Sequence, residues 1–168
     1  MTSTVISQVA ITQEKPIDRE KVCPLLLRIF VSTGRHNPMH EYGRGGTPAN
    51  ELQVYTWMDC SLRELTSLIK EVNPDARRRG TLFHFAVVSP DRNSPRYASR
   101  DLGGTTNGIR GMDDNKTLSL AKFEVGDYID CAITLPRGER RFGERYDDRN
   151  GFGGGQQRRG FSPSRRDF

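Results

Sequence analysis

Apolar and polar residues alternate along three stretches of the chain, which is the pattern of strands that bury one face. The alternation predicts strands over residues 25–31, 51–57 and 128–135. Pro24 suits the start of the first strand, where a missing backbone N–H matters least. The inward-facing sets are Leu25, Leu27, Ile29 and Val31; Leu52, Val54 and Thr56; and Ile129, Cys131, Ile133 and Leu135.

A helix is predicted from Leu62 to about Val72, because apolar residues recur there at helical spacing. Ser61 and Glu64 have the spacing of a capping box, in which each side chain satisfies the backbone N–H of the other residue. Pro74 ends the helix, since proline disfavours helical backbone in the residue before it. Arg77 to Arg79 follow, near the negative end of the helix dipole. They are interpreted as a solvated or dipole-complementing cluster, with a binding site as the alternative.

The other segments are less regular. Residues 81–88 have few polar positions, which predicts a strand buried on both faces. Residues 32–50 are rich in glycine, proline and polar residues and indicate a long hairpin loop. Residues 89–116 indicate an irregular insertion with one short edge strand near 96–102. Residues 118–125 form a short apolar segment.

A hairpin, one crossing helix and then two or three strands predict an α+β fold, a ubiquitin-like β-grasp roll with long loop insertions. The last strand would lie parallel to the first, in the middle of the sheet. The β-grasp domain is expected over residues 22–135. Residues 1–21 are predicted to be a flexible lead-in, and residues 136–168 a disordered Gly/Arg-rich tail.

Charge is concentrated in the predicted tail. Residues 136–168 hold nine arginines and five acids, a net charge of +4 out of +5 for the whole chain. The predicted domain is therefore close to neutral, and any argument from charge for nucleic-acid binding must rest on the tail. No apolar run approaches the ~20 residues needed to span a membrane, and no signal-peptide core is visible. These features predict a soluble, intracellular protein.

The tail combines glycine, arginine and phenylalanine. Too little apolar surface is present to offset the ~1–2 kcal/mol per residue that ordering the backbone costs. Its arginines could contact phosphates, and its phenylalanines offer stacking surfaces. Ser162 and Ser164 are candidate phosphorylation sites that would cancel much of the positive charge. The alternative is a solubilising linker without a specific partner. The candidate RNA contacts are Arg158, Arg159, Phe161, Arg165 and Arg166.

No pattern in the chain predicts an enzyme, a metal centre or a cofactor site. His36 and His40 are separated by Asn37-Pro38, and with His84 they lack convincing further zinc ligands. Gly43 to Pro48 is glycine-rich but lacks the ending of a phosphate-binding loop. No nucleophile elbow or catalytic triad is visible. The cysteines, which have no metal-ligand spacing, are interpreted as small buried thiols. An RNA recognition motif is excluded because the glycine-rich segment 103–115 cannot supply its second helix.

Several motifs in sequence order resemble the small Sin-associated polypeptide family, whose members are subunits of Sin-type histone deacetylase corepressor assemblies. The resemblance covers residues 22–135. The motifs are Tyr55-Thr56-Trp57-Met58-Asp59, the helix beginning Leu62-x-x-Leu65-Thr66-Ser67-Leu68, Phe83-x-Phe85-Ala86 and Phe123-x-x-Gly126-Asp127-Tyr128-Ile129-Asp130, together with Gly34-Arg35-His36 and Glu51-Leu52-Gln53.

The resemblance implies a non-catalytic adaptor without a cofactor. It implies two sets of partners: the Acinus-like and serine-rich RNA-binding proteins of the apoptosis-and-splicing-associated complex, and a Sin-type corepressor with histone deacetylase. It also implies a nuclear location, in nuclear speckles, with the cytoplasm as a second location. RNA binding through the tail is the alternative function. A conjugated modifier is disfavoured because the chain ends in Arg166-Asp167-Phe168 rather than Gly-Gly.

Aromatic residues on the outward face of the predicted hairpin are the first candidates for binding a partner. Phe30, Tyr55 and Trp57 could form one cross-strand patch, and exposed aromatic residues are typical interface anchors. The alternative is that the long insertions cover them and make a second small core. The hairpin loop adds His36, Tyr42 and Arg44 as secondary candidates, because long loops often carry function.

Overall fold

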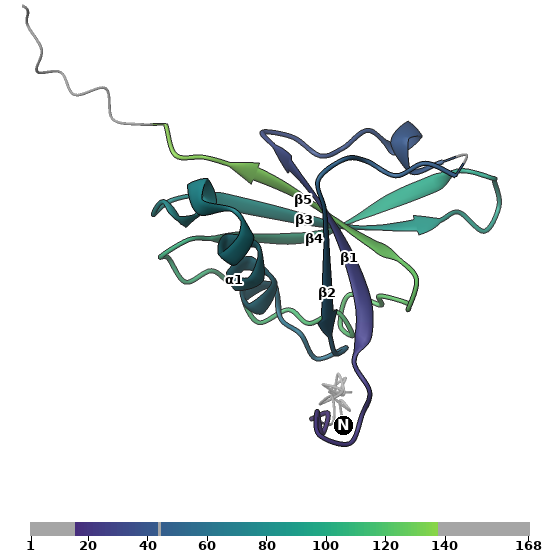
Figure 1. The fold of residues 1–168 in the computed structure, drawn as a ribbon, viewed down its shortest axis with the longest axis horizontal. Coiled ribbons are helices and arrows are strands. Elements are labelled where there is room, and N and C mark those ends of the chain that lie inside the picture. Colours follow the sequence, from purple (N-terminus) through teal and green to yellow (C-terminus); the bar gives the residue numbers. More distant parts are fainter. Residues whose placement is uncertain (1–15, 44, 138–168) are drawn as a thin grey trace, which may run out of the picture. The chain divides into compact units, whose positions relative to one another are not determined.

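One helix and a five-stranded mixed sheet form an α+β fold that resembles a β-grasp (Figure 1). The computed structural model describes residues 16–43 and 45–137. Within these residues no helix is both long and apolar enough to cross a membrane. The elements are β1 (Leu25–Thr33), the short 3-10 helix η1 (Met39–Tyr42), β2 (Glu51–Thr56), α1 (Leu62–Val72), the 3-10 helix η2 (Pro74–Arg77), β3 (Leu82–Pro90), β4 (Tyr97–Thr106) and β5 (Tyr128–Thr134).

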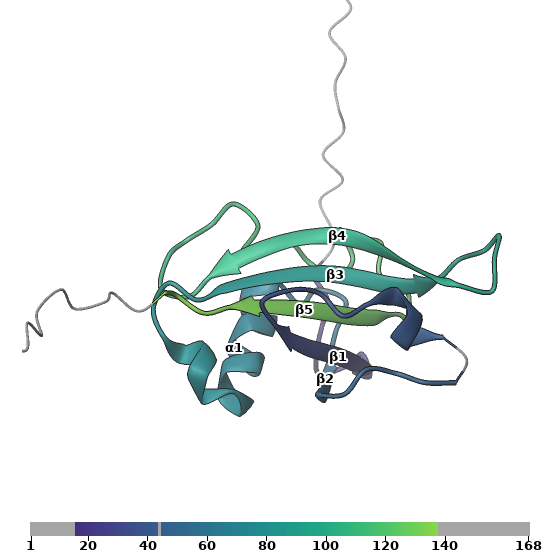
Figure 2. The ribbon, with the colours of Figure 1, turned by 90° about the horizontal axis from the view of Figure 1, so that it is seen from above.

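The strands lie in the order β2-β1-β5-β3-β4 (Figure 2). β5 runs parallel to β1, with Ile29 opposite Ile129, and every other pairing is antiparallel. The prediction that the last strand lies beside the first in the middle of the sheet is confirmed. Both edges of β5 are thus used by neighbouring strands, so its backbone N–H and C=O groups are paired within the sheet.

The main core lies between α1 and one face of the sheet. The inward residues of the central strands meet the apolar stripe of the helix, as the alternation predicted. Burying a side chain of this size contributes roughly 1.5–3 kcal/mol. The completely buried residues of this main core include Leu27 and Ile29 of β1, Leu62, Leu65 and Ile69 of α1, Phe85 and Val87 of β3, and Ile129 and Cys131 of β5.

The start of α1 forms only half of the predicted capping box. The Ser61 hydroxyl accepts a hydrogen bond of 3.3 Å from the Glu64 N–H. The Glu64 carboxylate does not reach back to Ser61, because Arg19 binds it. The first N–H groups of the helix are satisfied by a neighbouring loop instead. Leu62 N–H donates to the Lys116 carbonyl at 2.9 Å, and Arg63 N–H donates to the Asp114 carbonyl at 3.1 Å.

β3 and β4 form a longer hairpin than the composition indicated. The predicted short edge strand at 96–102 extends over Tyr97–Thr106, where it pairs with the whole of β3. Glycine suits positions 103 and 104 of this strand. A Cβ at Gly103 would collide with the Asp113 side chain, and a Cβ at Gly104 with the Phe83 carbonyl oxygen. The prediction for β3 holds in its second half, where Phe85 to Val88 are buried on both faces, whereas Leu82 and His84 are exposed.

A second, smaller core lies on the face of the sheet opposite α1. Phe30 and Tyr42 are buried there together with Val88, and their rings meet edge to face with centroids 5.4 Å apart. The loop between β1 and β2 covers Phe30, so its expected place in an exposed aromatic patch is wrong. Tyr42 is likewise buried rather than presented on the loop. Met39, Tyr97 and Tyr128 pack around this group.

Asp130 of β5 is a completely buried carboxylate at the centre of this second face. Tyr42 O–H donates to its Oδ1 at 2.7 Å, and the Asn37 side-chain amide donates to the same oxygen at 2.6 Å. Asn37 N–H and His36 Nδ1 contact Oδ2. A charge removed from water is tolerated only when its lone pairs are satisfied. The β1–β2 loop, residues 34–50, supplies all four of these contacts, and this explains why it lies across the sheet.

Replacing Asp130 should therefore remove the support of the whole loop. We expect Asp130→Ala to lower the free energy of unfolding by about 3–5 kcal/mol, because three polar partners are left without an acceptor. Asp75→Ala, at an exposed position of η2, is the matched control and should change it by less than ~0.5 kcal/mol. Urea unfolding followed by circular dichroism measures both. A loss below ~1 kcal/mol for Asp130→Ala would contradict this role.

Candidate partner-binding surface

An exposed apolar pair lies on the β1–β2 hairpin, on the face opposite α1. Leu26 and Tyr55 are directly opposite each other in the antiparallel register. Their side chains remain 41% and 72% exposed, whereas most residues of similar size in the sheet are buried. Directly opposed positions place side chains in contact range, so the two form one surface. Of the aromatic patch that the sequence predicts, Tyr55 is the member that stays largely exposed.

Trp57 lies just beyond β2 and is half-buried by the segment that precedes β1. Its indole N–H donates a 2.7 Å hydrogen bond to the Val22 carbonyl. The Arg19 guanidinium lies over the ring, 5.1 Å from its centroid, which is within range of a cation–π contact. Trp57 is thus neither freely exposed nor part of the second core, and it differs in this respect from Tyr55 and Phe30.

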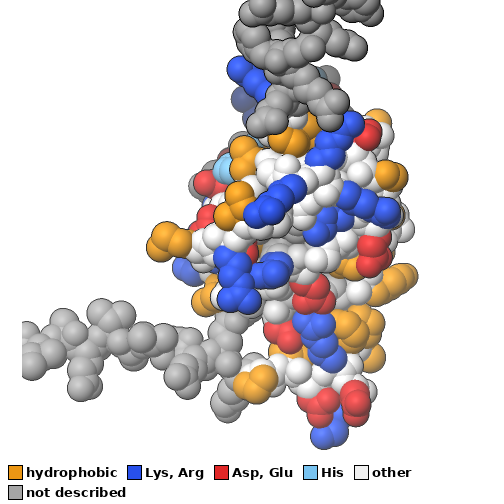
Figure 3. Space-filling model, turned by 90° about the vertical axis from the view of Figure 1, so that its left-hand side faces the viewer, with side chains coloured by type: hydrophobic (Ala, Val, Ile, Leu, Met, Phe, Trp, Pro, Cys, Tyr) orange, Lys and Arg blue, Asp and Glu red, His pale blue; other side chains and the backbone are white. Residues whose placement is uncertain are grey.

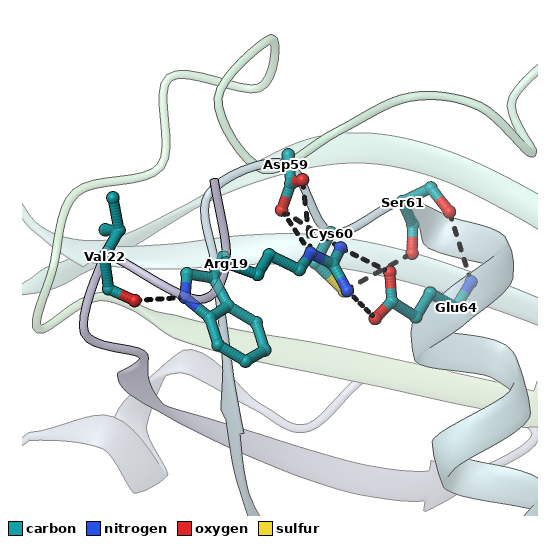
Figure 4. A network of polar contacts seen from close by, with 7 residues as sticks. Arg19, Val22, Asp59, Cys60, Ser61 and Glu64 are labelled. Carbon is teal, nitrogen blue, oxygen red and sulfur yellow. Dashed lines mark hydrogen bonds and ion pairs between the residues drawn. The ribbon is translucent and has the colours of Figure 1, made fainter. Parts of the chain in front are cut away.

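Arg19 joins this segment to the start of α1 (Figure 4). Its guanidinium forms two hydrogen bonds of 3.0 Å with the Glu64 carboxylate and contacts Asp59 at 3.0 Å. The bonds from Glu64 and Asp59 raise the pKa of Arg19 above its ordinary value. Residues 16–21 belong to the predicted flexible lead-in, and in the structure Arg19 has these partners on the domain. Side chains this exposed contribute modestly to stability, since solvent screens them.

A charged pair borders the apolar surface. Arg28 of β1 binds the carboxylate of Glu51 in β2, and this bond lowers the pKa of Glu51 to about 2. The same guanidinium lies 5.4 Å from the centroid of Phe30 and 5.0 Å from that of Tyr128. Arg28 therefore covers the edge of the second core, and the exposed apolar surface ends there.

β2 is also an edge strand, with β1 as its only neighbour among the described strands. The outer edge of such a strand presents N–H and C=O groups that can pair with an extended segment of another chain. Tyr55 combines this open backbone edge with an exposed aromatic ring on the same strand. An arrangement of this kind can bind a peptide through backbone hydrogen bonds and side-chain contact together.

The secondary candidates do not join this surface. His36 and Tyr42 lie around Asp130, in the middle of the sheet, and β1 separates them from Tyr55. Arg44 lies outside the described residues. So do the tail residues Arg158, Arg159, Phe161, Arg165 and Arg166, together with Ser162 and Ser164. Their roles remain predictions.

Two of the three arginines after α1 have different contacts. Arg77 donates to the carbonyls of Lys70 and Glu71 at 2.8 and 3.0 Å, so it caps the end of the helix, as the dipole argument predicted. The Arg79 side chain lies against Gly108 of the turn after β4.

Lysine and arginine are numerous on the α1 side of the domain and are interspersed with acids (Figure 3). This face is therefore mixed in charge.

The described residues contain no group of three or more His, Cys, Asp or Glu side chains that could hold a metal ion. Cys60 and Cys131 are buried free thiols, as expected, and burial raises the pKa of Cys60 to about 12. Cys23 differs from the expectation because it is exposed. A thiol with a pKa this high is a poor nucleophile at neutral pH.

Three contributors to these sites were missed in the sequence. Asp130 interrupts an otherwise apolar strand, and a lone carboxylate at such a position is itself a sign of buried partners. Leu26 lies between inward-facing Leu25 and Leu27, so the alternation directs it outward, but its exposure depends on where the loop lies. Arg19 carried no periodic signal, since an isolated cation before a strand resembles any other surface charge.

Arg19→Ala should loosen the segment over Trp57. We expect the emission of Trp57, the only tryptophan in the chain, to shift to longer wavelength as the ring becomes more hydrated. The loss in unfolding free energy should stay near 1 kcal/mol, because the pairs are partly exposed. Lys21→Ala, whose side chain pairs only locally with Asp18, is the control and should leave the emission unchanged. Identical spectra for Arg19→Ala and the unmodified chain would argue against the contact.

Comparison with known proteins places these features in a family. Residues 16–133 match the model of the family described as Sin3 associated polypeptide p18 (SAP18), a range that includes Arg19. The probable histone deacetylase complex subunit SAP18 of Caenorhabditis elegans is 63% identical over 86% of this chain and 92% of its own length. The histone deacetylase complex subunits SAP18 of Drosophila melanogaster and Homo sapiens are 57% and 56% identical, over 74% and 73% of this chain and 83% and 81% of their own lengths. The chain therefore belongs to the SAP18 family.

Proposed function

We propose that the protein is a non-catalytic nuclear adaptor of a Sin-type histone deacetylase corepressor complex. Family membership supports this, because the relatives are named as subunits of a histone deacetylase complex. The observation that carries the proposal is the exposed Leu26–Tyr55 pair on the open edge of the sheet. An adaptor acts by binding partners, and this surface has the properties of a binding site.

The surface suits an extended peptide segment of a partner. Backbone groups at the open edge of β2 can bind any sequence in strand conformation, whereas Tyr55 and Leu26 favour an apolar side chain at alternate positions. A tyrosine supplies a large contact area at low cost in side-chain entropy, which is why it is frequent among the residues that dominate binding energy. The Arg28–Glu51 pair can add charged contacts at the rim.

The adaptor role extends to RNA processing in this proposal. The resemblance implies an apoptosis-and-splicing-associated complex with an Acinus-like protein and a serine-rich RNA-binding protein, and hence a location in nuclear speckles as well as in corepressor assemblies. A domain close to neutral in charge favours protein partners over direct contact with nucleic acid. One surface would then bind peptide segments from alternative partners.

Tyr55→Ala tests the surface directly. We expect it to reduce co-purification of the Sin-type corepressor and of histone deacetylase activity from nuclear extract by at least ~10-fold, equivalent to about 1.4 kcal/mol. The free energy of unfolding should change by less than ~1 kcal/mol, since the ring is exposed. Leu120→Ala, at a residue that is 59% exposed outside the sheet, is the control and should leave binding intact. Full binding by Tyr55→Ala would rule out this surface, and a large stability loss would show that the ring is structural.

RNA binding through the tail is the second candidate function, favoured by the +4 charge of residues 136–168. Removing residues 138–168 leaves every described helix and strand in place. We expect this truncation to lower RNA affinity at least ~10-fold and to reduce the dependence of affinity on salt, because arginine–phosphate contacts release counterions. Fluorescence anisotropy with a labelled single-stranded RNA at several salt concentrations measures both quantities. Unchanged affinity and salt slope would exclude the tail as the RNA-binding element.

A further inference from the structure

Four ionisable side chains from different parts of the chain form a continuous row on the face opposite α1. The row begins at buried Asp130 in β5 and continues through His36 of the loop, His84 of β3 and Asp101 of β4. His36 Nε2 lies 2.7 Å from His84 Nδ1, and His84 Nε2 lies 3.3 Å from an Asp101 oxygen. The two rings meet at 64° with centroids 5.0 Å apart.

The buried end of the row determines one proton position. Both carboxylate oxygens of Asp130 accept hydrogen bonds: Oδ1 from Tyr42 and the Asn37 side chain, and Oδ2 from the Asn37 N–H. His36 Nδ1, which also contacts Oδ2, must therefore carry a hydrogen. His36 Nε2 is then free either to accept or to donate toward His84. The tautomer of His36 thus follows from its surroundings rather than from observed hydrogens.

Proton counting shows which states of the histidine pair keep it joined. The row contains two hydrogen bonds, Asp130–His36 and His36–His84, and each needs one hydrogen between its two heavy atoms. The His84–Asp101 contact at 3.3 Å is an ion pair, which attracts only when His84 is charged. Two hydrogens on the four ring nitrogens satisfy both hydrogen bonds with a neutral pair, and a third hydrogen, on His84 Nε2, adds the ion pair and gives a net charge of +1. With four, two N–H groups oppose each other across 2.7 Å.

We propose that His36 and His84 form a protonation-controlled latch that fastens the β1–β2 loop to β3. The latch is closed when the pair holds at most one extra proton, because a single hydrogen then lies between His36 Nε2 and His84 Nδ1. A second proton opens it, because the two N–H groups then repel. Solvent protons have access, since the His36 and His84 side chains are 32% and 52% exposed.

The other charged groups near His36 and His84 do not take over the role of the histidine pair in holding the loop. Asp113, which lies near His84, is occupied by the Lys116 ammonium at 2.8 Å and by the Gly104 N–H. Arg35 precedes His36 on the loop and lines the same open pocket. Tyr42 donates to Asp130 from the buried side, and burial together with this bond raises its pKa above its ordinary value, so it stays protonated. Asp101 is the remaining carboxylate of the row and is 68% exposed.

An open latch changes how the loop is held. Gly34 N–H donates to the Ile133 carbonyl at 2.8 Å, and Asn37 N–H donates to Asp130 at 3.2 Å. These bonds tie the loop to β5 alone. Between these two bonded residues, the His36–His84 contact joins the loop to β3. Its loss leaves the segment from Gly34 to Asn37 attached on one side, so its backbone opens more often without unfolding of the domain.

Nuclear magnetic resonance of the full chain with ¹⁵N-labelled histidine tests the latch. Near pH 7 we expect a scalar coupling between His36 Nε2 and His84 Nδ1 across the hydrogen bond, and its loss toward about pH 5, in the range where histidine charges. Over the same interval, hydrogen-exchange protection of the Gly34 and Asn37 amides, corrected for intrinsic exchange, should fall at least ~3-fold, a small local opening.

Two variants separate the latch from general acid effects. His84→Gln keeps a polar group at the site but cannot titrate, so it should abolish the coupling and make loop protection independent of pH. His40→Gln removes the exposed histidine of the same loop and should behave like the unmodified chain. Absence of the coupling at pH 7, or an equal pH response in His84→Gln, would overturn the proposal. Both variants alter exposed positions, so folding is preserved.

Discussion

The buried carboxylate of Asp130 is the constraint on which the second face of the domain depends. A charge in the central strand of a sheet must be satisfied by donors, and the residues near it in sequence lie within the apolar sheet. The β1–β2 loop brings His36, Asn37 and Tyr42 to it, and the aromatic ring of Tyr42 then covers Phe30. One ionic residue thus fixes a loop that has little regular structure of its own.

This arrangement decides which part of the sheet remains available to a partner. The loop covers the middle of the face, Arg28 covers the border of the second core, and the segment around Arg19 partly covers Trp57. On the described β1–β2 hairpin, Leu26 and Tyr55 stay exposed, beside the edge of β2 that no other described strand pairs. The proposed binding surface is therefore defined as much by what covers its neighbours as by its own residues.

The same carboxylate connects the interior with solvent. Asp130 orients His36, which contacts His84. His84 in turn lies beside Asp101 at the surface. A loop held in this way has a rigid buried anchor and an outer attachment whose strength depends on protonation. The two attachments differ in character because burial removes one of them from water and leaves the other within its reach.

The sequence by itself determined the main architecture: alternation placed β1, β2 and β5, helical spacing placed α1, and their order predicted the parallel pairing of β1 with β5. These features are local and periodic, so they are visible in one dimension. Only the tertiary structure decided that Phe30 is buried while Tyr55 is exposed, that Glu64 binds Arg19 instead of closing the capping box, and that β4 extends to Thr106. Each of these depends on contacts between residues far apart in the chain, which no local pattern records.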